Sequence, residues 1–432
     1  MSANVTSTSP SDWKYVSEGG SSIVFSYVGA PSPDFDGTAL RLRKVAHYPI
    51  SPETIVSEDI EEQEDPTILF QCQVIQRLIP SEYLPRLESV DVEGPWLEEL
   101  ARLAEEHRPL ERRAKDKIDV RRRKAVLAND LVGGSGWAVE IKPKWGFLPN
   151  PTHLSPSTKV TKSQTCRFCM HSHLKTTEGE DASLGYCPLD LYSGEEKRVR
   201  KALDVLWDAW VGSSGGVNNF KIFVEGHMLR PTTFPSSLGP IAHQVFSANA
   251  AEPSLDTLRD QVISPLLPLL LETPVLRILS THQRNLDALD IEGLSSLWSE
   301  THKPAGSLEA APVPPLGKGL SQPTIEELEN FVDVYLEKHA SMDHNHPDTA
   351  DLRYYCIAYL LSATFKDCSI ILRLHPAVGN TPARSSITVI DLDVKSIDRL
   401  PTWEKLDQKV VKAYAGVSQP TRCYDRWAPA RL

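Results

Sequence analysis

The sequence lacks an excess of basic residues: 57 Asp and Glu residues outnumber 46 Lys and Arg residues, and the net charge is −11. Proteins that coat nucleic acids usually carry a basic excess, so this class is disfavoured and any anion site must be local. Residues 1–13 contain neither a basic nor an apolar segment, which predicts no secretory signal. The most apolar stretch, VISPLLPLLLETPVLRIL, is broken by prolines and a glutamate, so we expect no membrane segment.

Cysteines are few and odd in number: seven in 432 residues. This count fits a reducing compartment, where clustered cysteines more often bind metal than form disulfides. The length is sufficient for two lobes, each with its own core. We find no internal repeat.

The first third of the chain predicts a β-rich unit. Between Lys14 and Val45 the pattern is strand, Gly-Gly-Ser-Ser turn, strand, loop and strand. An acidic and solvated loop, 51–65, precedes a predicted helix over 65–80, and a second helix is predicted over 94–107. The turn, EGGSS, lacks the G-x-G-x-x-G form and is weak evidence for a phosphate loop by itself.

The remaining chain is mainly helical in pattern. Strong helical periodicity covers 194–212, 324–339 and 349–367. Short strands are predicted within NNFKIFVEG, DCSIILRLHP and SSITVIDLDVK, and the Pro-rich segment 302–323 is typical of a mobile insertion.

This order of elements favours an α+β, two-lobed kinase-like fold with a small β-rich N-lobe and a larger mixed C-lobe. We predict an N-terminal lobe over 1–139, a hinge over 140–149 and a C-terminal lobe over 150–432. Kinase chemistry needs a phosphate-covering loop, cations on the transferring group, a metal-holding Asp and a base at the accepting hydroxyl. An enzyme of another type with a similar element order is the alternative.

The stretch VEIKPKWGFLP, 139–149, points to an anion site. In an extended segment Glu140, Lys142 and Lys144 share one face, and two adjacent ammonium groups call for an anionic partner. The run 108–124 adds nine Lys or Arg against three acids. Most such runs are solvated surfaces; here we interpret this one as part of an electropositive cleft.

The segment CRFCMHSHLK, 166–175, predicts a metal half-site. On a helix of about 100° per residue, Cys166, Cys169 and His173 lie within roughly 60° of one another. Arg167, His171 and Lys175 lie on a different, cationic face. With Cys187, the first group makes a closed set of three thiolates and one imidazole for structural Zn²⁺. Two reduced core thiols are the alternative, and a loop conformation would make either histidine eligible.

At this point the sequence resembles the inositol-pentakisphosphate 2-kinase family over nearly its whole length. Ten blocks match in order: SDWKYVSEGGSSIVFSYVG, ALRLRK, RPLER, VEIKPKWGFLP, CRFCMHSHLK, YCPLDLYSG, NNFKIF, LDALDIEG, ATFKDCSI and VIDLDVKSIDRL. The family transfers the γ-phosphoryl group of ATP to the 2-hydroxyl of inositol 1,3,4,5,6-pentakisphosphate and forms the hexakisphosphate, phytate. The resemblance thus implies ATP and the pentakisphosphate as partners, with catalytic Mg²⁺.

The resemblance also implies roles around the nucleotide. Glu140, at the hinge, accepts the adenine amino group, and Asp391 holds Mg²⁺. Asp367 is the general base, and Lys142 is the second catalytic residue, directed at the phosphates. The remaining implied nucleotide contacts are Gly19, Gly20, Arg41, Asn129 and Asp130. For any single Asp, a plain capping role is the alternative.

Five phosphates at about −1.5 to −2 each demand converging cations. The implied inositide contacts are Arg112, Lys144, Arg167, His171, Lys175, Asn218, Lys221, Lys395, Arg399 and Trp403. Lys221 stands where the family can have arginine, and Trp403 stands where plant members have tyrosine. Strand alternation predicts that Asp391, Asp393 and Lys395 lie on one side of the chain.

The predicted zinc ligands differ from those of some family members. Those members bind zinc through a C-x-x-C in the region of the Pro-rich insertion, where this chain has no cysteine. Its own set, Cys166, Cys169, His173 and Cys187, resembles the animal pattern. The resemblance implies a location in the nucleus and also in the cytoplasm. We expect a monomer, and the acidic net charge and the lack of a membrane segment predict neither a nucleic-acid nor a membrane partner. A catalytically silent inositide-binding scaffold on the same fold is the competing hypothesis.

Overall fold

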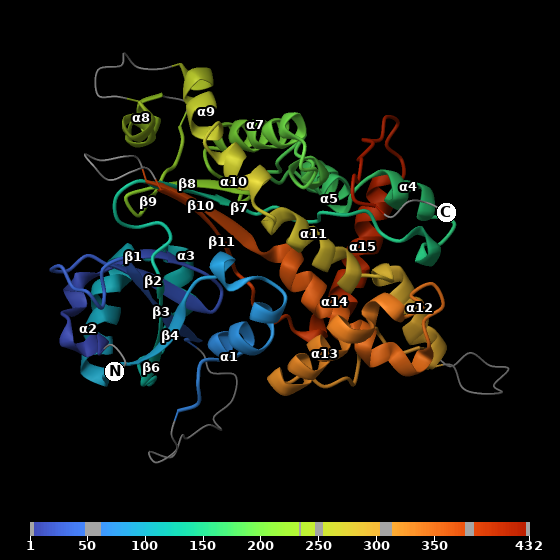
Figure 1. The fold of residues 1–432 in the computed structure, drawn as a ribbon, viewed down its shortest axis with the longest axis horizontal. Coiled ribbons are helices and arrows are strands. Elements are labelled where there is room, and N and C mark those ends of the chain that lie inside the picture. The colour runs from blue at the N-terminus through green and yellow to red at the C-terminus, as the bar shows by residue number, and fades with distance from the viewer. Residues whose placement is uncertain are drawn as a thin grey trace.

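The computed structural model describes residues 4–47, 62–232, 235–246, 254–302, 313–375 and 384–428. It contains two antiparallel sheets and many helices, which confirms the α+β class. Figure 1 shows the N-terminal sheet at one end and the C-terminal helices at the other. Residues 51–61 of the predicted acidic loop and residues 303–312 of the Pro-rich insertion lie outside the described residues.

The N-terminal sheet has the strand order β1-β2-β3-β6-β4, with β5 paired to β3. Its strands are β1 (Trp13–Glu18), β2 (Ser22–Tyr27), β3 (Thr38–Ala46), β4 (Leu87–Asp91), β5 (Asp116–Ile118) and β6 (Lys124–Asn129). Alternation buries Ile23, Phe25, Leu40 and Leu42 on one face, where helix α2 (Gly94–Ala104) adds its apolar stripe. The predicted strand-turn-strand pattern of this region is therefore confirmed.

The second sheet has the order β11-β10-β7-β8-β9. Its strands are β7 (Trp137–Ile141), β8 (Phe220–Val224), β9 (His227–Met228), β10 (Ser369–His375) and β11 (Arg384–Ile390). Strand β7 is buried along its whole length and pairs with β10 and β8. The predicted hinge segment thus begins inside a central strand, and the chain passes from one sheet to the other over residues 130–136.

The predicted alternation after β11 is wrong. The strand ends at Ile390, and Asp391 has a positive φ of 60°. A left-handed residue breaks the period of two, so Asp391, Asp393 and Lys395 do not lie along one strand face.

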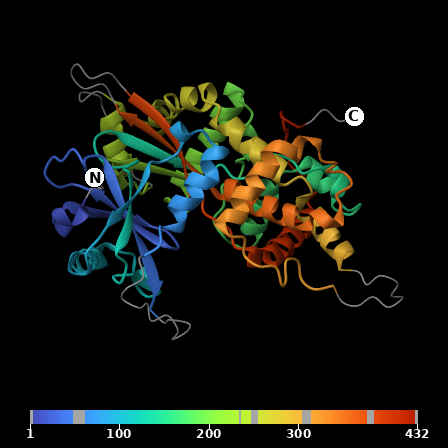
Figure 2. The ribbon, with the colours of Figure 1, turned by 60° about the horizontal axis from the view of Figure 1, so that its bottom comes forward.

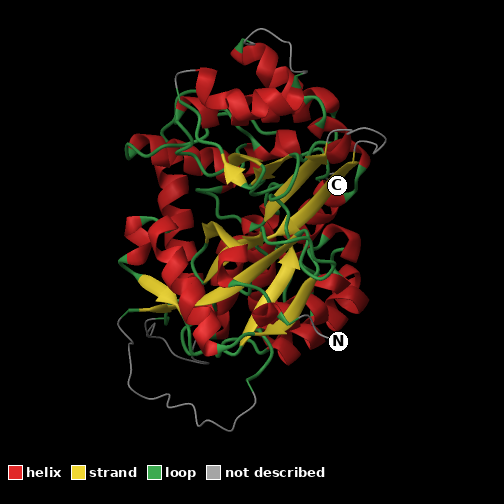
Figure 3. Cartoon of the chain, turned by 90° about the vertical axis from the view of Figure 1, so that its left-hand side faces the viewer, coloured by secondary structure: helices red, strands yellow, loops and turns green. Residues whose placement is uncertain are grey.

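Helices surround the strands (Figure 3). They are α1 (Pro66–Gln73), α3 (Leu110–Arg113), α4 (Lys159–Gln164), α5 (Arg167–Thr177), α6 (Pro188–Leu191), α7 (Glu196–Gly212), α8 (Gly239–Val245), α9 (Leu255–Ile263), α10 (Leu266–Glu272), α11 (Val275–Leu286), α12 (Asp290–Thr301), α13 (Ile325–Lys338), α14 (Leu352–Asp367) and α15 (Leu400–Tyr414). The predicted helices over 94–107, 194–212, 324–339 and 349–367 are confirmed as α2, α7, α13 and α14.

The largest core joins the second sheet to α7, α11 and α14. Phe70, Val74 and Ile75 belong to this core, so the segment around α1 packs with it although it precedes β4 in the chain. Figure 2 shows this light-blue segment between the blue strands and the orange helices. By length and hydropathy, no single described helix could cross a membrane. The stretches Leu255–Glu272 and Val275–Thr301 are long and apolar enough only when taken together, and they are bent by 60° relative to each other.

Candidate functional site

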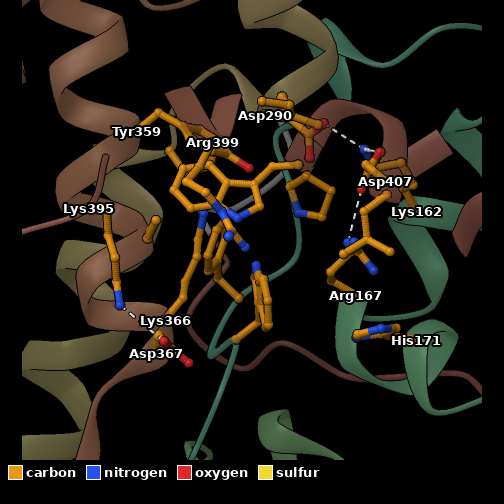
Figure 4. Close-up of a pocket in the computed structure, with 18 of the residues that line it drawn as sticks. Lys162, Arg167, His171, Asp290, Tyr359, Lys366, Asp367, Lys395, Arg399 and Asp407 are labelled. Atoms are coloured by element: carbon orange, nitrogen blue, oxygen red, sulfur yellow. Dashed lines mark hydrogen bonds and ion pairs between the residues drawn. The ribbon is translucent and has the colours of Figure 1, made fainter. Parts of the chain in front are cut away.

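A cavity of about 450 Å³ lies among the helices and is named here the helical cavity. A second, of about 360 Å³, lies between the two sheets and is named the inter-sheet cavity. The helical cavity is lined by residues of α5, α14 and α15 and of the segments that join them (Figure 4). Two carboxylates, Asp367 and Asp391, each line one of the two cavities.

The inter-sheet cavity gathers all the residues predicted to bind the nucleotide. Its walls include Gly19, Gly20, Arg41, Asn129, Asp130, Glu140, Lys142 and Asp391. The Gly-Gly turn between β1 and β2 thus covers it from the N-terminal sheet. Two of the side chains already have structural partners, because Asn129 accepts the backbone N–H of Arg86 and Asp130 accepts those of Val132 and Gly133.

Glu140 is buried at the base of the inter-sheet cavity. One carboxylate oxygen accepts from Lys221 Nζ at 2.9 Å and the other from Ser369 Oγ at 2.9 Å. Lys221 lines this cavity and not the helical one. Lys221 therefore pairs with Glu140, whereas the resemblance implied that it contacts the inositide.

Lys142 forms an ion pair with Asp391, Nζ to Oδ2 at 3.2 Å. The Ser369 hydroxyl also lies 3.0 Å from this oxygen, and its single proton is donated either here or to Glu140. Burial lowers the pKa of Lys142, but the attraction of Asp391 and Glu140 outweighs it and the net shift is upward. Lys142 is thus a fixed cation between the two carboxylates.

Asp367, the last residue of α14, lies between two ammonium groups. Lys144 Nζ approaches one carboxylate oxygen at 3.0 Å, and Lys395 Nζ approaches the other at 3.0 Å. Burial raises the pKa of Asp367, but the two lysines outweigh this effect and lower the pKa to about 2. The carboxylate is ionised at neutral pH and can accept a proton.

The backbone explains how Lys142 and Lys144 reach different carboxylates. Lys144 has a positive φ of 65°, which interrupts the extended run that follows β7. The predicted anionic partners of the two lysines exist within the chain as Asp391 and Asp367.

The helical cavity brings together five of the ten predicted inositide contacts. Arg167, His171, Lys395, Arg399 and Trp403 line it, with Asp367 at its edge. Burial, together with Arg167 and Lys175, lowers the pKa of His171 to about 4, so the imidazole is neutral at pH 7. The lining holds five Lys or Arg residues against four Asp residues, so the cavity has a cationic excess of one charge.

Four predicted contacts line neither cavity, and one of them, Lys144, is paired with Asp367. Lys175 pairs with Glu180 at 3.1 Å on the exposed side of α5, Asn218 is exposed, and Arg112 lies on α3. The run 108–124 as a whole also lines neither cavity, so its interpretation as part of the cleft is wrong. Its cations have local partners instead: Arg108 is buried against Glu18 and Asp116.

Four thiols converge beside α5. The Sγ atoms of Cys166, Cys169, Cys187 and Cys423 all lie within 4.8 Å of one another. The Cys166–Cys187 and Cys169–Cys423 sulfur distances are 3.9 and 3.7 Å. Tetrahedral Zn²⁺ with Zn–S bonds of about 2.3 Å separates its sulfurs by about 3.8 Å, so this donor set fits the metal.

The predicted set is corrected at one position. His173 is not in this group, because its ring packs edge-on against Tyr414 at 5.4 Å. Cys423, near the end of the described chain, takes its place. A lone cysteine 236 residues beyond Cys187 carries no spacing signal, so sequence reasoning missed it.

Sequence reasoning also missed the residues that support the helical cavity. Trp145, Phe147 and Tyr359 form aromatic walls, and Lys162 and Asp407 form a buried ion pair behind Arg167. The sequence around Lys162 has only a weak helical pattern, so it does not indicate that this lysine is buried.

The candidate site thus consists of two cavities: the inter-sheet cavity lies under the glycine turn, and the helical cavity carries Lys and Arg side chains and has a paired carboxylate at its edge. The family model for inositol-pentakisphosphate 2-kinase matches residues 15–409. The inositol-pentakisphosphate 2-kinase of Cryptococcus neoformans var. neoformans serotype D is 35% identical over 94% of both chains. Those of Arabidopsis thaliana and Danio rerio are 26% and 27% identical over similar shares. The chain belongs to the inositol-pentakisphosphate 2-kinase family.

Proposed function

We propose that this chain transfers the γ-phosphoryl group of ATP to the 2-hydroxyl of inositol 1,3,4,5,6-pentakisphosphate, giving the hexakisphosphate and ADP. The bond from the γ-phosphorus to the bridging oxygen breaks, and a bond to the inositol oxygen forms. The observation that supports this most directly is Asp367, an ionised carboxylate held between Lys144 and Lys395 at the edge of the cationic helical cavity.

Asp367 is the proposed proton acceptor. In phosphoryl transfer with a loose transition state, the base mainly aligns the hydroxyl and takes its proton late. Lys144 and Lys395 hold the carboxylate in place before substrate binds, and both are close enough to share their charge with a substrate phosphate.

The inter-sheet cavity is the proposed ATP site. Lys142 offers a fixed positive charge to the phosphates, and Arg41 lines the same wall. Asp391 is the proposed Mg²⁺ ligand, since it is a carboxylate partly exposed to this cavity and Mg²⁺ commonly uses one or two carboxylates together with substrate phosphates. Bound Mg²⁺ neutralises charge that develops on the transferring group.

The helical cavity is the proposed inositide site. Arg167, Lys395 and Arg399 contribute positive charge from three different elements, which suits a ligand with phosphates around a ring. The acidic net charge of the chain makes this gathering of cations local.

We also propose structural Zn²⁺ at the four-thiol group. The metal would join Cys166 and Cys169, at the start of α5, to Cys187 and to Cys423 in the C-terminal segment. Because α5 also carries Arg167 and His171, Zn²⁺ would hold one wall of the helical cavity. By family resemblance we further propose a monomer that acts in the nucleus and the cytoplasm.

The central test compares wild type with Asp367→Asn. We expect turnover of the pentakisphosphate in the presence of ATP and Mg²⁺ to fall by at least about 100-fold, because the proton acceptor is lost. Asp343→Asn, an exposed acid remote from both cavities, is the control and should keep wild-type turnover. Equal rates for wild type and Asp367→Asn would reject the assigned base. Tight binding without turnover by wild type would favour the silent scaffold.

A further inference from the structure

A buried lysine lies behind the helical cavity. Lys162, on α4, has a side chain that is 2% exposed, and its Nζ contacts Asp290 at 2.6 Å, Glu292 at 3.0 Å and Asp407 at 2.8 Å. These three carboxylates have the spacing of a metal-binding group. The ammonium already bonds all three, so the group is an internal ion cluster.

Asp407 connects this cluster to the cavity. One of its carboxylate oxygens accepts a hydrogen bond from Lys162, and the other forms an ion pair with Arg167, whose Nε lies 3.0 Å away. Figure 4 shows the three side chains in this order, with Arg167 nearest to His171. Asp407 is on α15 and Arg167 is the first residue of α5, so the contact joins two helices.

Arg167 is oriented but not saturated by these contacts. Its Nη1 atom is buried and forms no hydrogen bond within the described part of the chain. Its guanidinium lies 5.8 Å from the centre of the Trp145 ring. A guanidinium has five N–H groups, and the ion pair with Asp407 lies at its Nε side, which leaves Nη1 for a ligand.

Lys162 determines how strongly the charge of Asp407 acts on Arg167. An unshared buried carboxylate would attract the guanidinium away from a phosphate and lower its effective charge. Because Lys162 donates to the same carboxylate, Asp407 orients Arg167 while its own charge is largely balanced.

We propose that Asp407, held by Lys162, is a positioning residue that fixes Arg167 to receive one phosphate group of the inositide. This inference rests on the proposed function, since the ligand is the pentakisphosphate. The same helix, α15, follows directly after Arg399 and carries Trp403. One helix thus supplies direct contacts and orients a contact from another helix.

The test is a double-mutant cycle between Asp407→Asn and Arg167→Ala. We expect Asp407→Asn to raise the KM for the pentakisphosphate about tenfold, because Arg167 loses the ion pair that positions it. The KM for ATP and the kcat should stay within about twofold. In the Arg167→Ala background the same change should alter the KM by less than about twofold, because the two residues act through one contact.

A measurement without turnover accompanies the kinetics. Calorimetric titration with the pentakisphosphate in the absence of ATP should show the same loss of affinity for Asp407→Asn and the same non-additivity. If Asp407→Asn does not fold, Asp407→Glu serves in its place, because it keeps the charge beside Lys162 and displaces only the oxygen that meets Arg167.

The chain offers a matched control in Asp190. This half-buried acid accepts from Arg198 Nε on one oxygen and from Lys201 Nζ on the other, in the same pattern, outside both cavities. Asp190→Asn should leave the KM for the pentakisphosphate unchanged.

Three results would overturn the positioning role: an unchanged KM in Asp407→Asn, a lowered KM, or an equal effect with and without Arg167. Absence of binding and turnover by wild type would instead reject the proposed function, so the two failures are distinguishable.

Discussion

At the scale of single residues, Lys144 and Lys395 determine the protonation state of Asp367. The pKa of this carboxyl is about 2, below the value of about 3.9 for an unfolded chain. The folded state therefore binds its proton less readily, so the pairing contributes stability above pH 4 and loses it as the pH falls towards 2.

We expect wild type to be more stable than Asp367→Asn at pH 6 and the difference to vanish between pH 4 and pH 2. Urea unfolding of both proteins at a series of pH values measures this. A difference that stays constant down to pH 2 would contradict the assigned pairing. Because the carboxyl stays ionised above pH 4, any acid limb of turnover near pH 6 must come from another group.

Lys221 gives a second prediction at this scale. It pairs with Glu140 in the inter-sheet cavity, whereas the family resemblance implied an inositide contact. We expect Lys221→Met to raise the KM for ATP about tenfold, as expected for loss of a hydrogen bond to a charged group, and to leave the KM for the pentakisphosphate unchanged. Lys221→Arg, which keeps the charge, is the control. A rise confined to the KM for the inositide would restore the implied role.

At the scale of elements, a buried ion cluster holds the glycine turn. Glu18 ends β1 just before Gly19 and contacts Lys44 of β3 at 3.1 Å and Arg108 at 3.0 Å. All three side chains are at most 2% exposed. Removing the acid leaves these two buried cations with Asp116 as their one remaining shared carboxylate.

Glu18→Gln should lower the free energy of unfolding by about 3 kcal/mol and raise the KM for ATP, since the turn covers the inter-sheet cavity. Chemical unfolding and ATP kinetics measure the two effects. Glu99→Gln, in an exposed pair with Arg102, should change the stability by less than about 0.5 kcal/mol. Equal small effects in both variants would show that the cluster does not support the turn.

The elements themselves were largely predictable from sequence. Period-two alternation located β2, β3 and β8, and helical periodicity located α7, α13 and α14, because each buries one regular face. The alternation across Asp391 failed because a single left-handed residue ends the strand pattern without a glycine to signal it. The run 108–124 failed because charge counts do not show which acids lie nearby, and Glu18 and Asp116 neutralise Arg108.

At the scale of the whole molecule, the four-thiol group connects the C-terminal segment to the wall of the helical cavity. Cys423 N–H also donates to the backbone oxygen of Gln164 at 2.8 Å, just before α5. Metal bound here would tie residues more than 250 positions apart in the sequence. Such long-range pairings were beyond sequence reasoning, as was the burial of Lys162 against α12 and α15.

We expect purified protein to contain one equivalent of Zn²⁺, Cys423→Ser to lose it, and His173→Gln to retain it. The loss should lower the melting temperature and raise the KM for the pentakisphosphate, because α5 is less firmly held. Elemental analysis and thermal unfolding measure these effects. Cys356→Ala, a buried thiol outside the group, is the control and should keep its metal. Undiminished zinc in Cys423→Ser would remove that ligand.

Two residues central to the proposed chemistry, Lys144 and Asp391, have left-handed backbone conformations that favour glycine. Each such residue costs on the order of 1 kcal/mol that the surrounding structure must offset. Glycine at 144 or 391 would relieve this backbone strain and at the same time remove an ion pair of the site, Lys144 with Asp367 or Asp391 with Lys142. Any engineering of this enzyme for heat tolerance therefore has to screen for product in every round.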